Sequence, residues 1–415
     1  MFKKYILTII LVLTIICPIS YADDVFEEKT LSKEELQNTM EASNNLHDVP
    51  TINARHAIVI ERNSKSILYG KKETEQCKMA STTKIMTAIV TIENSNLKDT
   101  VTVSKKSAGT GGSRLGLCTN DKITVESLLY GLMMCSGNDS AVALAEHLGG
   151  SIEGFSDLMN NKANELGLFS THFVTPHGLD NDDHYTTAYD LAILTNYALS
   201  NKIFAKIVRT KTFTITINNH TKSLRNTNEL LGNLDGIYGV KTGFTNGANR
   251  CLVTSCKRGN LDIICVVLGC DTKKDRTRDS IKLINYIFNN FTVINVKDII
   301  DSDFKKWNEE HKNSFYIDKG LSNTLDLYLN ENSIPYKSIA INNKDIGTIS
   351  TSIKFESQYT APLPCNNVIG KLSFNVNNIE YFSVDILNSN EIQKKNIFTY
   401  YFELIRNFIN YLCIK

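Results

Sequence analysis

Apolar residues recur along the first half of the chain at two different spacings, and each spacing predicts its own kind of element. Short, largely apolar runs at 56–60 and 66–69 flank Asn63-Ser64-Lys65, which predicts a pair of strands joined by a turn. Helical spacing then takes over in five segments. These predicted helices are 83–93, 125–134, 139–147, 155–166 and 187–199.

Strand-like runs return after the helical block. They lie at 239–245, 250–256 and 261–269, separated by the turn sequences Asn246-Gly247 and Arg258-Gly259-Asn260. A helix is predicted at 279–291. The order of strands, helices and strands predicts an α+β domain over 51–291, with an antiparallel sheet and a helical cluster.

The pattern changes again beyond residue 291. Short β-type runs such as 315–317, 325–329 and 381–386 predict a separate small all-β domain over 292–389. The tail at 390–415 is rich in Phe, Tyr, Ile and Leu, yet Glu403 and Arg406 lie within it, which a spanning helix would not readily hold. We expect an amphipathic C-terminal helix on a membrane surface. A helix docked on its own protein is the alternative.

The start of the chain has the order of a secretory signal peptide. Lys3 and Lys4 precede an apolar run at 5–17, and Ser20-Tyr21-Ala22 supplies the small residues of a cleavage site. The sequence therefore predicts a signal peptide at 1–22 and export to the outer face of the cytoplasmic membrane or the cell wall. An uncleaved anchor is the alternative. Residues 23–50 form a polar, acidic leader.

Composition narrows the range of functions. The 415 residues carry a formal charge of only +1, which argues against a nucleic-acid partner because such proteins need a basic surface. The ten cysteines include one within the signal peptide. Nine thiols cannot form a closed set of disulfides, so most are expected to be buried and free.

A first candidate for catalysis is Ser81-Thr82-Thr83-Lys84, at the start of a predicted helix. A spacing of three places both ends on one helix face, so the Lys84 amine can reach the Ser81 hydroxyl and act as its base. The helix start also offers N–H groups to a developing oxyanion. Alone the signal is weak, since Ser95 and Lys98 have the same spacing.

Two further motifs accompany it. Ser136-Gly137-Asn138 lies between two predicted helices, where it either faces a cleft or simply caps the second helix. Lys241-Thr242-Gly243 lies inside a predicted strand, where a glycine often marks close approach of a ligand to the backbone. An edge-strand bulge is the alternative for this glycine.

Together the three motifs match the Ser-x-x-Lys, Ser-x-Asn and Lys-Thr-Gly set of penicillin-binding proteins and class A β-lactamases. Ser136 follows Ser81 by 55 residues, and Lys241 follows Ser136 by 105. Residues 54–291 resemble the serine-type D-alanyl-D-alanine carboxypeptidases, the low-molecular-mass penicillin-binding proteins of peptidase type S11. Segments 79–88, 136–141, 175–179 and 184–190 add to this resemblance, which is closest to clostridial and bacillar members, some of them linked to sporulation.

The resemblance implies a β-lactamase/transpeptidase-like fold and an acyl-enzyme mechanism without a metal or other cofactor. Ser81 would attack the carbonyl between the terminal D-alanines of a peptidoglycan stem peptide, and Lys84 would accept its proton. Ser136 would relay a proton to the leaving D-alanine, with Lys241 keeping the local field positive. β-Lactam antibiotics would acylate Ser81 in the same way.

The resemblance also implies a set of substrate contacts. They are Asn138 for the substrate backbone, Thr242 for the terminal carboxylate, Gly243 for close approach, the N–H groups of Ser81 and Phe244 for the oxyanion, and Arg276 or Arg278 for a further carboxylate contact.

The sequence departs from the family pattern in two places. Asn249 stands where the family usually has a glycine, and no Glu-x-x-x-Asn lies between Ser136 and Lys241, which disfavours rapid β-lactam hydrolysis.

Two alternative functions stay open from the sequence. One alternative is a metallopeptidase using His177 and His184 with nearby aspartates. The other is a non-catalytic penicillin- or peptidoglycan-binding wall protein.

Overall fold

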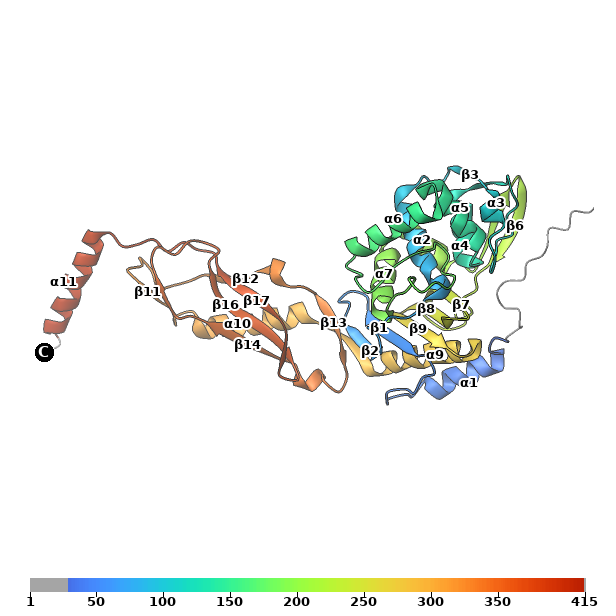
Figure 1. The fold of residues 1–415 in the computed structure, drawn as a ribbon. Coiled ribbons are helices and arrows are strands. Elements are labelled where there is room, and N and C mark those ends of the chain that lie inside the picture. Colours follow the sequence, from blue (N-terminus) through green and yellow to red (C-terminus); the bar gives the residue numbers. More distant parts are fainter. Residues whose placement is uncertain (1–28, 414–415) are drawn as a thin grey trace, which may run out of the picture.

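A larger body with a central sheet is followed along the chain by a narrower, elongated body and a terminal helix (Figure 1). The computed structural model describes residues 29–413. The predicted signal peptide at 1–22 therefore lies outside the described residues.

The larger body is built on a five-stranded sheet in the order β2-β1-β9-β8-β7, with every neighbouring pair antiparallel. The strands are β1 (His56–Glu61), β2 (Ile67–Lys71), β7 (Ile237–Thr245), β8 (Asn249–Arg258) and β9 (Leu261–Cys270). The strand at one edge, β7, carries the Lys-Thr-Gly motif. Each strand predicted from the sequence in this body is confirmed, with ends that differ by at most two residues.

Both faces of this sheet are covered, as the alternation along β1 makes clear. Ile58 and Ile60 point into a core shared with the helical cluster, whereas Ala57 and Val59 point into a second core shared with α9 (Lys273–Asn290). Figure 1 shows the helical cluster on one side of the sheet and α9 with α1 on the other. The cluster consists of α2 (Lys84–Asn94), α4 (Val125–Met134), α5 (Asn138–Gly149), α6 (Ile152–Glu165), α7 (Ala188–Ser200) and α8 (Lys202–Arg209).

Short elements connect these helices. They are η1 (Ala80–Thr83), β3 (Thr100–Thr102), α3 (Lys105–Ala108), β4 (Lys122–Thr124), β5 (Thr212–Ile217) and β6 (His220–Arg225). The hairpin of β5 and β6 and the helix α8 have no counterpart among the elements predicted from the sequence.

The polar leader contains a helix that the sequence pattern did not predict. In α1 (Lys33–Ser43), the Ser32 hydroxyl accepts from the amide of Glu35, and the Glu35 carboxylate accepts in return from the amide of Ser32. The helix packs on α9, where the Asn285 amide donates to the Ser43 hydroxyl over 2.8 Å. The leader therefore contributes regular structure to the larger body.

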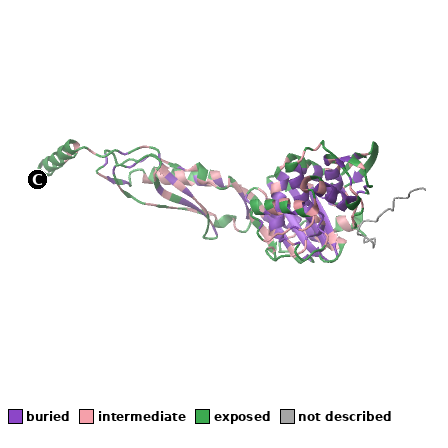
Figure 2. Cartoon of the chain, turned by 45° about the horizontal axis from the view of Figure 1, so that its top comes forward, coloured by how far each residue is buried: buried purple, intermediate pink, exposed green. Residues whose placement is uncertain are grey.

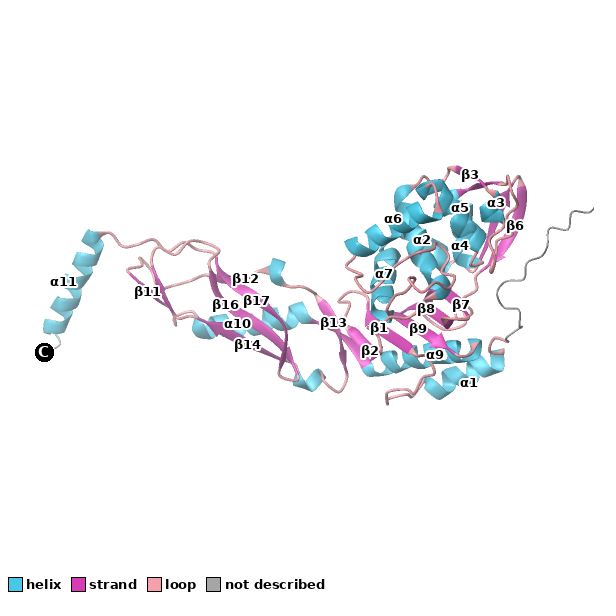
Figure 3. Cartoon of the chain, viewed as in Figure 1, coloured by secondary structure: helices cyan, strands magenta, loops and turns pink. Residues whose placement is uncertain are grey.

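The elongated body is mostly β-structure but is not made of strands alone. Its central sheet has the order β12-β17-β16-β14, and a long helix, α10 (Val296–His311), packs against it through Val296 and Ile300. Its strands are β10 (Phe291–Asn295), β11 (Tyr316–Asp318), β12 (Leu327–Leu329), β13 (Ser338–Asn342), β14 (Ser350–Phe355), β15 (Gln358–Thr360), β16 (Val368–Val376) and β17 (Ile379–Asn388), with short helices η2 (Glu331–Ser333) and η3 (Ile346–Thr348). The expectation of an all-β domain thus missed α10 (Figure 3).

The two bodies are joined without a free linker. The helix α9 runs directly into β10, which pairs with β13, and Ala340 of β13 is buried in the second core of the larger body. The side-chain amide of Asn63 also donates, through Nδ2, to the backbone carbonyl of Ser338 over 3.1 Å.

The tail forms one helix, α11 (Ile397–Cys413), whose apolar side chains are exposed along its length (Figure 2). Among residues 29–413, none of the helices combines the length and apolar character needed to cross a bilayer.

The described cysteines are free thiols. Burial raises their pKa where they lie in the sheet, for example to about 12 for Cys256 and about 11 for Cys251.

Candidate active site

Ser81 and Lys84 lie where η1 passes into α2, and their side chains meet. Lys84 is fully buried, and its Nζ donates to Ser81 Oγ over 2.8 Å. The same amine donates to Asn138 Oδ1 over 2.7 Å and to the carbonyl of His177 over 2.9 Å. These contacts hold the amine beside the hydroxyl, in the geometry that a nucleophile and its base require.

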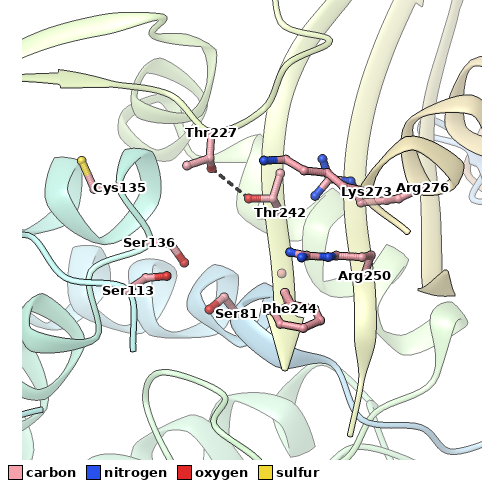
Figure 4. A pocket seen from close by; sticks show the side chains of 11 residues that line it. Ser81, Ser113, Cys135, Ser136, Thr227, Thr242, Phe244, Arg250, Lys273 and Arg276 are labelled. Atoms are coloured by element: carbon pink, nitrogen blue, oxygen red, sulfur yellow. Dashed lines mark hydrogen bonds between the residues drawn. The ribbon is translucent and has the colours of Figure 1, made fainter. Parts of the chain in front are cut away.

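The second motif forms the turn between α4 and α5. Ser136 has a φ of +59°, and its side chain lines the same pocket as Ser81 (Figure 4). The turn is held by the buried carboxylate of Asp139, which accepts from the amides of Leu115, Gly116 and Leu117 over 2.7–3.0 Å.

Asn138 is engaged within the protein at both ends of its side-chain amide. Its Oδ1 accepts from Lys84, and its Nδ2 donates to the carbonyl of Gly111 over 2.8 Å. In this structure Asn138 holds Lys84 in place, and the contact to the substrate backbone that the family resemblance implies stays a prediction.

The edge strand β7 runs directly against the turn that carries Ser81. A Cβ placed on Gly243 would lie 3.1 Å from the Ser81 amide nitrogen and 3.2 Å from Ala80 Cβ. A side chain at this position would therefore push the strand away from the nucleophile. The neighbouring Thr242 hydroxyl is hydrogen-bonded to that of Thr227 over 2.8 Å.

Lys241 is fully buried in the same strand, two residues before Gly243 and on the same face of the sheet. Its Nζ donates to the carbonyl of Thr242 over 2.7 Å. Burial, with a smaller contribution from the positive charge of Arg276, lowers the pKa of Lys241 to about 7. The amine therefore changes its charge near neutral pH.

The two arginines of α9 point to different places. Arg276 is buried, lines the pocket and donates through Nη2 to Glu229 over 2.8 Å. Arg278 lies near Glu35 and Asp275, at 3.8 and 3.6 Å, away from the pocket. Of the two, only Arg276 is placed to meet a ligand in the pocket.

Figure 4 shows the pocket that these residues enclose, with Ser81 and Ser136 on one side and Thr242 and Arg276 on the other. The sequence analysis missed five residues of its lining, which are Ser113, Cys135, Thr227, Arg250 and Lys273. Arg250 stacks its guanidinium on the ring of Phe244, 3.7 Å from the ring centre. The departure noted at Asn249 is accommodated, because asparagine tolerates the left-handed φ of +57° found there.

The two histidines proposed as metal ligands use their ring nitrogens within the protein. His184 Nδ1 accepts from the amide of Val174 over 3.0 Å, and its Nε2 lies 2.8 Å from Thr83 Oγ1. His177 Nδ1 accepts from the amide of Leu179 over 3.2 Å. Burial is the main cause that lowers the pKa of His177 to about 3 and of His184 to about 4, so both are neutral near pH 7. Within residues 29–413, we found no group of three or more His, Cys, Asp or Glu side chains suited to a metal ion.

Known proteins with similar sequences and structures identify the family of this chain. The family model described as D-alanyl-D-alanine carboxypeptidase, peptidase S11, matches residues 42–272. The D-alanyl-D-alanine carboxypeptidase DacF of Bacillus subtilis (strain 168) is 33% identical over 335 residues, which cover 77% of this chain and 80% of DacF. The corresponding DacC of Escherichia coli (strain K12) is 33% identical over 343 residues, covering 80% of this chain and 82% of DacC.

Among solved structures, penicillin binding protein 5 from Haemophilus influenzae superposes with a TM-score of 0.68 at 27% identity. The match covers 84% of this chain and 99% of that one, so it includes the elongated body as well as the larger one. The chain belongs to the D-alanyl-D-alanine carboxypeptidase family, peptidase S11.

Proposed function

We propose that this chain is a serine D-alanyl-D-alanine carboxypeptidase that removes the terminal D-alanine from peptidoglycan stem pentapeptides through an acyl-enzyme on Ser81. The observation that carries the proposal is the 2.8 Å hydrogen bond between Lys84 Nζ and Ser81 Oγ at the floor of the pocket. Family membership supports the reaction class.

In the acylation step, Lys84 acts as a neutral amine. Its two N–H groups donate to Asn138 Oδ1 and the His177 carbonyl, and its lone pair takes the proton of Ser81 as Oγ attacks the carbonyl carbon between the two D-alanines. The oxyanion that forms accepts hydrogen bonds from the N–H groups of Ser81 and Phe244, a geometry supported by the close approach of Gly243 to Ser81. As the C–N bond breaks, the proton passes from Lys84 through the Ser136 hydroxyl to the leaving amine, and Ser136 keeps its own protonation state. D-Alanine departs, and water then hydrolyses the ester to release the shortened peptide and free Ser81.

The terminal carboxylate of the substrate binds at the far side of the pocket. Thr242 offers a hydroxyl there and Arg276 a buried positive charge. Only the last residue of a peptide has a free α-carboxylate. Binding of this group beside Thr242 and Arg276 would therefore restrict cleavage to the end of the peptide, as in an exopeptidase.

The function is tested with the full chain and a stem-pentapeptide analogue that ends in D-Ala-D-Ala. We expect release of D-alanine and covalent labelling by fluorescent penicillin, both unchanged by a chelator. Labelling without peptide hydrolysis would favour the non-catalytic binding protein, and loss of activity on chelation would favour the metallopeptidase.

The tail supports a second part of the proposal, that the exported protein lies at the outer face of the cytoplasmic membrane. Phe402, Ile405 and Ile409 are among the exposed apolar side chains of α11, which suits a helix lying in the lipid headgroup region.

We expect deletion of 391–415 to abolish sedimentation of the protein with vesicles that contain anionic lipid, while D-alanine release in solution stays unchanged. Ile405→Asp should weaken the binding at least tenfold, because it places a charge among apolar side chains. Asn407→Asp adds the same charge outside the apolar set and is the matched control. Undiminished vesicle binding by the deletion variant would mean that the tail is not the anchor.

A further inference from the structure

Residues 174–184 form a loop that touches both parts of the active site, and the mechanism above does not use it. Along this loop, the carbonyl of Pro176 accepts from Thr87 over 2.6 Å, and that of His177 accepts from Lys84 over 2.9 Å. The loop therefore lies directly on the start of α2. Two further sets of contacts reach the turn before Ser81, through His184, and the end of β7, through Asp180.

The contact to the nucleophile runs through His184 and Thr83. Because His184 Nδ1 accepts from the amide of Val174, its proton is on Nε2, which donates to Thr83 Oγ1 over 2.8 Å. Thr83 Oγ1 in turn donates to the carbonyl of Ala80 over 2.8 Å. His184, Thr83 and Ala80 are all buried.

The carbonyl at the end of this chain belongs to the residue just before the nucleophile. Ala80 has a φ of +48°, which costs energy for a residue with a Cβ and needs support from its surroundings. Gly178 gives that support on the other side, since a Cβ placed on it would lie 2.0 Å from the Ala80 oxygen. The direction of the Ser81 N–H follows from this turn.

The contact to β7 runs through Asp180. Its Oδ1 accepts from the hydroxyl of Thr245 over 2.7 Å, and its Oδ2 accepts from the amide of Gly247 over 2.8 Å. Thr245 follows Phe244 directly, so this carboxylate holds the strand end next to the second N–H of the oxyanion site.

We propose that His184, acting through Thr83, and Asp180 are positioning residues that fix the two oxyanion-binding N–H groups, on η1 and on β7, relative to one another. The proposal rests on the proposed function. Neither residue belongs to the lining of the pocket. Their effect is on the transition state, because an oxyanion site stabilises charge only when its donors are held in advance at the right separation.

Thr83→Val tests the first contact, since it keeps the shape of the side chain and removes the hydroxyl. We expect kcat for D-alanine release and the rate of acylation by fluorescent penicillin to fall by about tenfold or more, with KM within about twofold. Thr83→Ser restores the hydroxyl and should recover most of the rate.

Thr87→Val is the matched control. It removes another buried threonine hydroxyl that donates to a carbonyl of the same loop, one turn further along α2 and away from Ala80. A purely structural role would make both valine variants equally unstable and equally slow. We expect similar melting temperatures for the two and a rate defect only in Thr83→Val.

Asp180→Asn tests the second contact. Asp182→Asn is its control, because Asp182 lies on the same loop but pairs with Lys78 and not with the end of β7. The double variant Thr83→Val/Asp180→Asn should be less impaired than the product of the single effects, because both act on one separation. If wild type is active and Thr83→Val stays within twofold of it, or if the double variant is fully multiplicative, the positioning role is overturned while the function stands. An inactive wild type would instead count against the function itself.

Discussion

Ser81→Ala should abolish labelling by fluorescent penicillin and lower kcat for D-alanine release by about 10⁴-fold or more. The alanine variant has no oxygen to form the ester, so what remains is the small effect of binding and the oxyanion site. Since Ser81 is not part of the packed core, its loss should leave the melting temperature within a few degrees of wild type. Gel fluorescence and a D-alanine assay measure both results.

Ser95→Ala is the matched control for this experiment. Ser95 also precedes a lysine at the spacing of three, but its hydroxyl donates to the carbonyl of Thr91 within the end of α2. We expect this variant to label at the wild-type rate. Labelling that persists in Ser81→Ala, or that is lost in Ser95→Ala, would show that the nucleophile has been misassigned.

Lys84→Arg should slow acylation by about 10²–10⁴-fold, because a guanidinium supplies N–H donors but stays protonated and cannot take up the serine proton near neutral pH. The amine contacts three acceptors in a buried site, so the larger arginine will also lower the melting temperature. Stopped-flow measurement of penicillin acylation separates the chemical defect from the loss of folded protein.

Lys84→Met is the companion variant, since it has a similar length but neither charge nor proton acceptor. If Lys84 is the base, both variants are slow to a similar degree. If Lys84→Arg acylates at close to the wild-type rate while Lys84→Met does not, the residue acts as a fixed positive charge and the base must be sought elsewhere.

The sequence predicted a helix or strand well where the buried residues of that element are apolar and recur at a regular spacing. Both ends of α4 match the predicted helix 125–134, because apolar residues fill this helix and Thr124 caps its start. The start of α9 was placed six residues too late, because its first turns are charged and only the Thr272 cap marks them. The helix α10 was missed for a related reason, since only Val296 and Ile300 are buried along it.

For the site, local motifs predicted the serines and lysines that the fold brings together at the pocket. The sequence could not predict the hydrogen-bond partner of each side chain. Glu229 and Thr227 belong to no motif, and they reach Arg276 and Thr242 only because the chain turns back after β6. The use of Asn138 to hold Lys84 likewise depends on a contact between two residues that lie on different helices and are 54 positions apart in sequence.

The direct passage of α9 into β10, with Ala340 buried in the core of the larger body, has a consequence for how the enzyme would meet its substrate. With such a joint and a tail held at the membrane, the pocket would search a thin shell whose depth is set by the length of the elongated body (Figure 1). The wall polymer is itself immobile. The rate at which the enzyme meets a stem peptide is then set by the effective concentration of stem peptides within that shell. Rates on soluble peptides would accordingly understate the rate on stem peptides that lie at the right height, and would overstate it for those beyond reach.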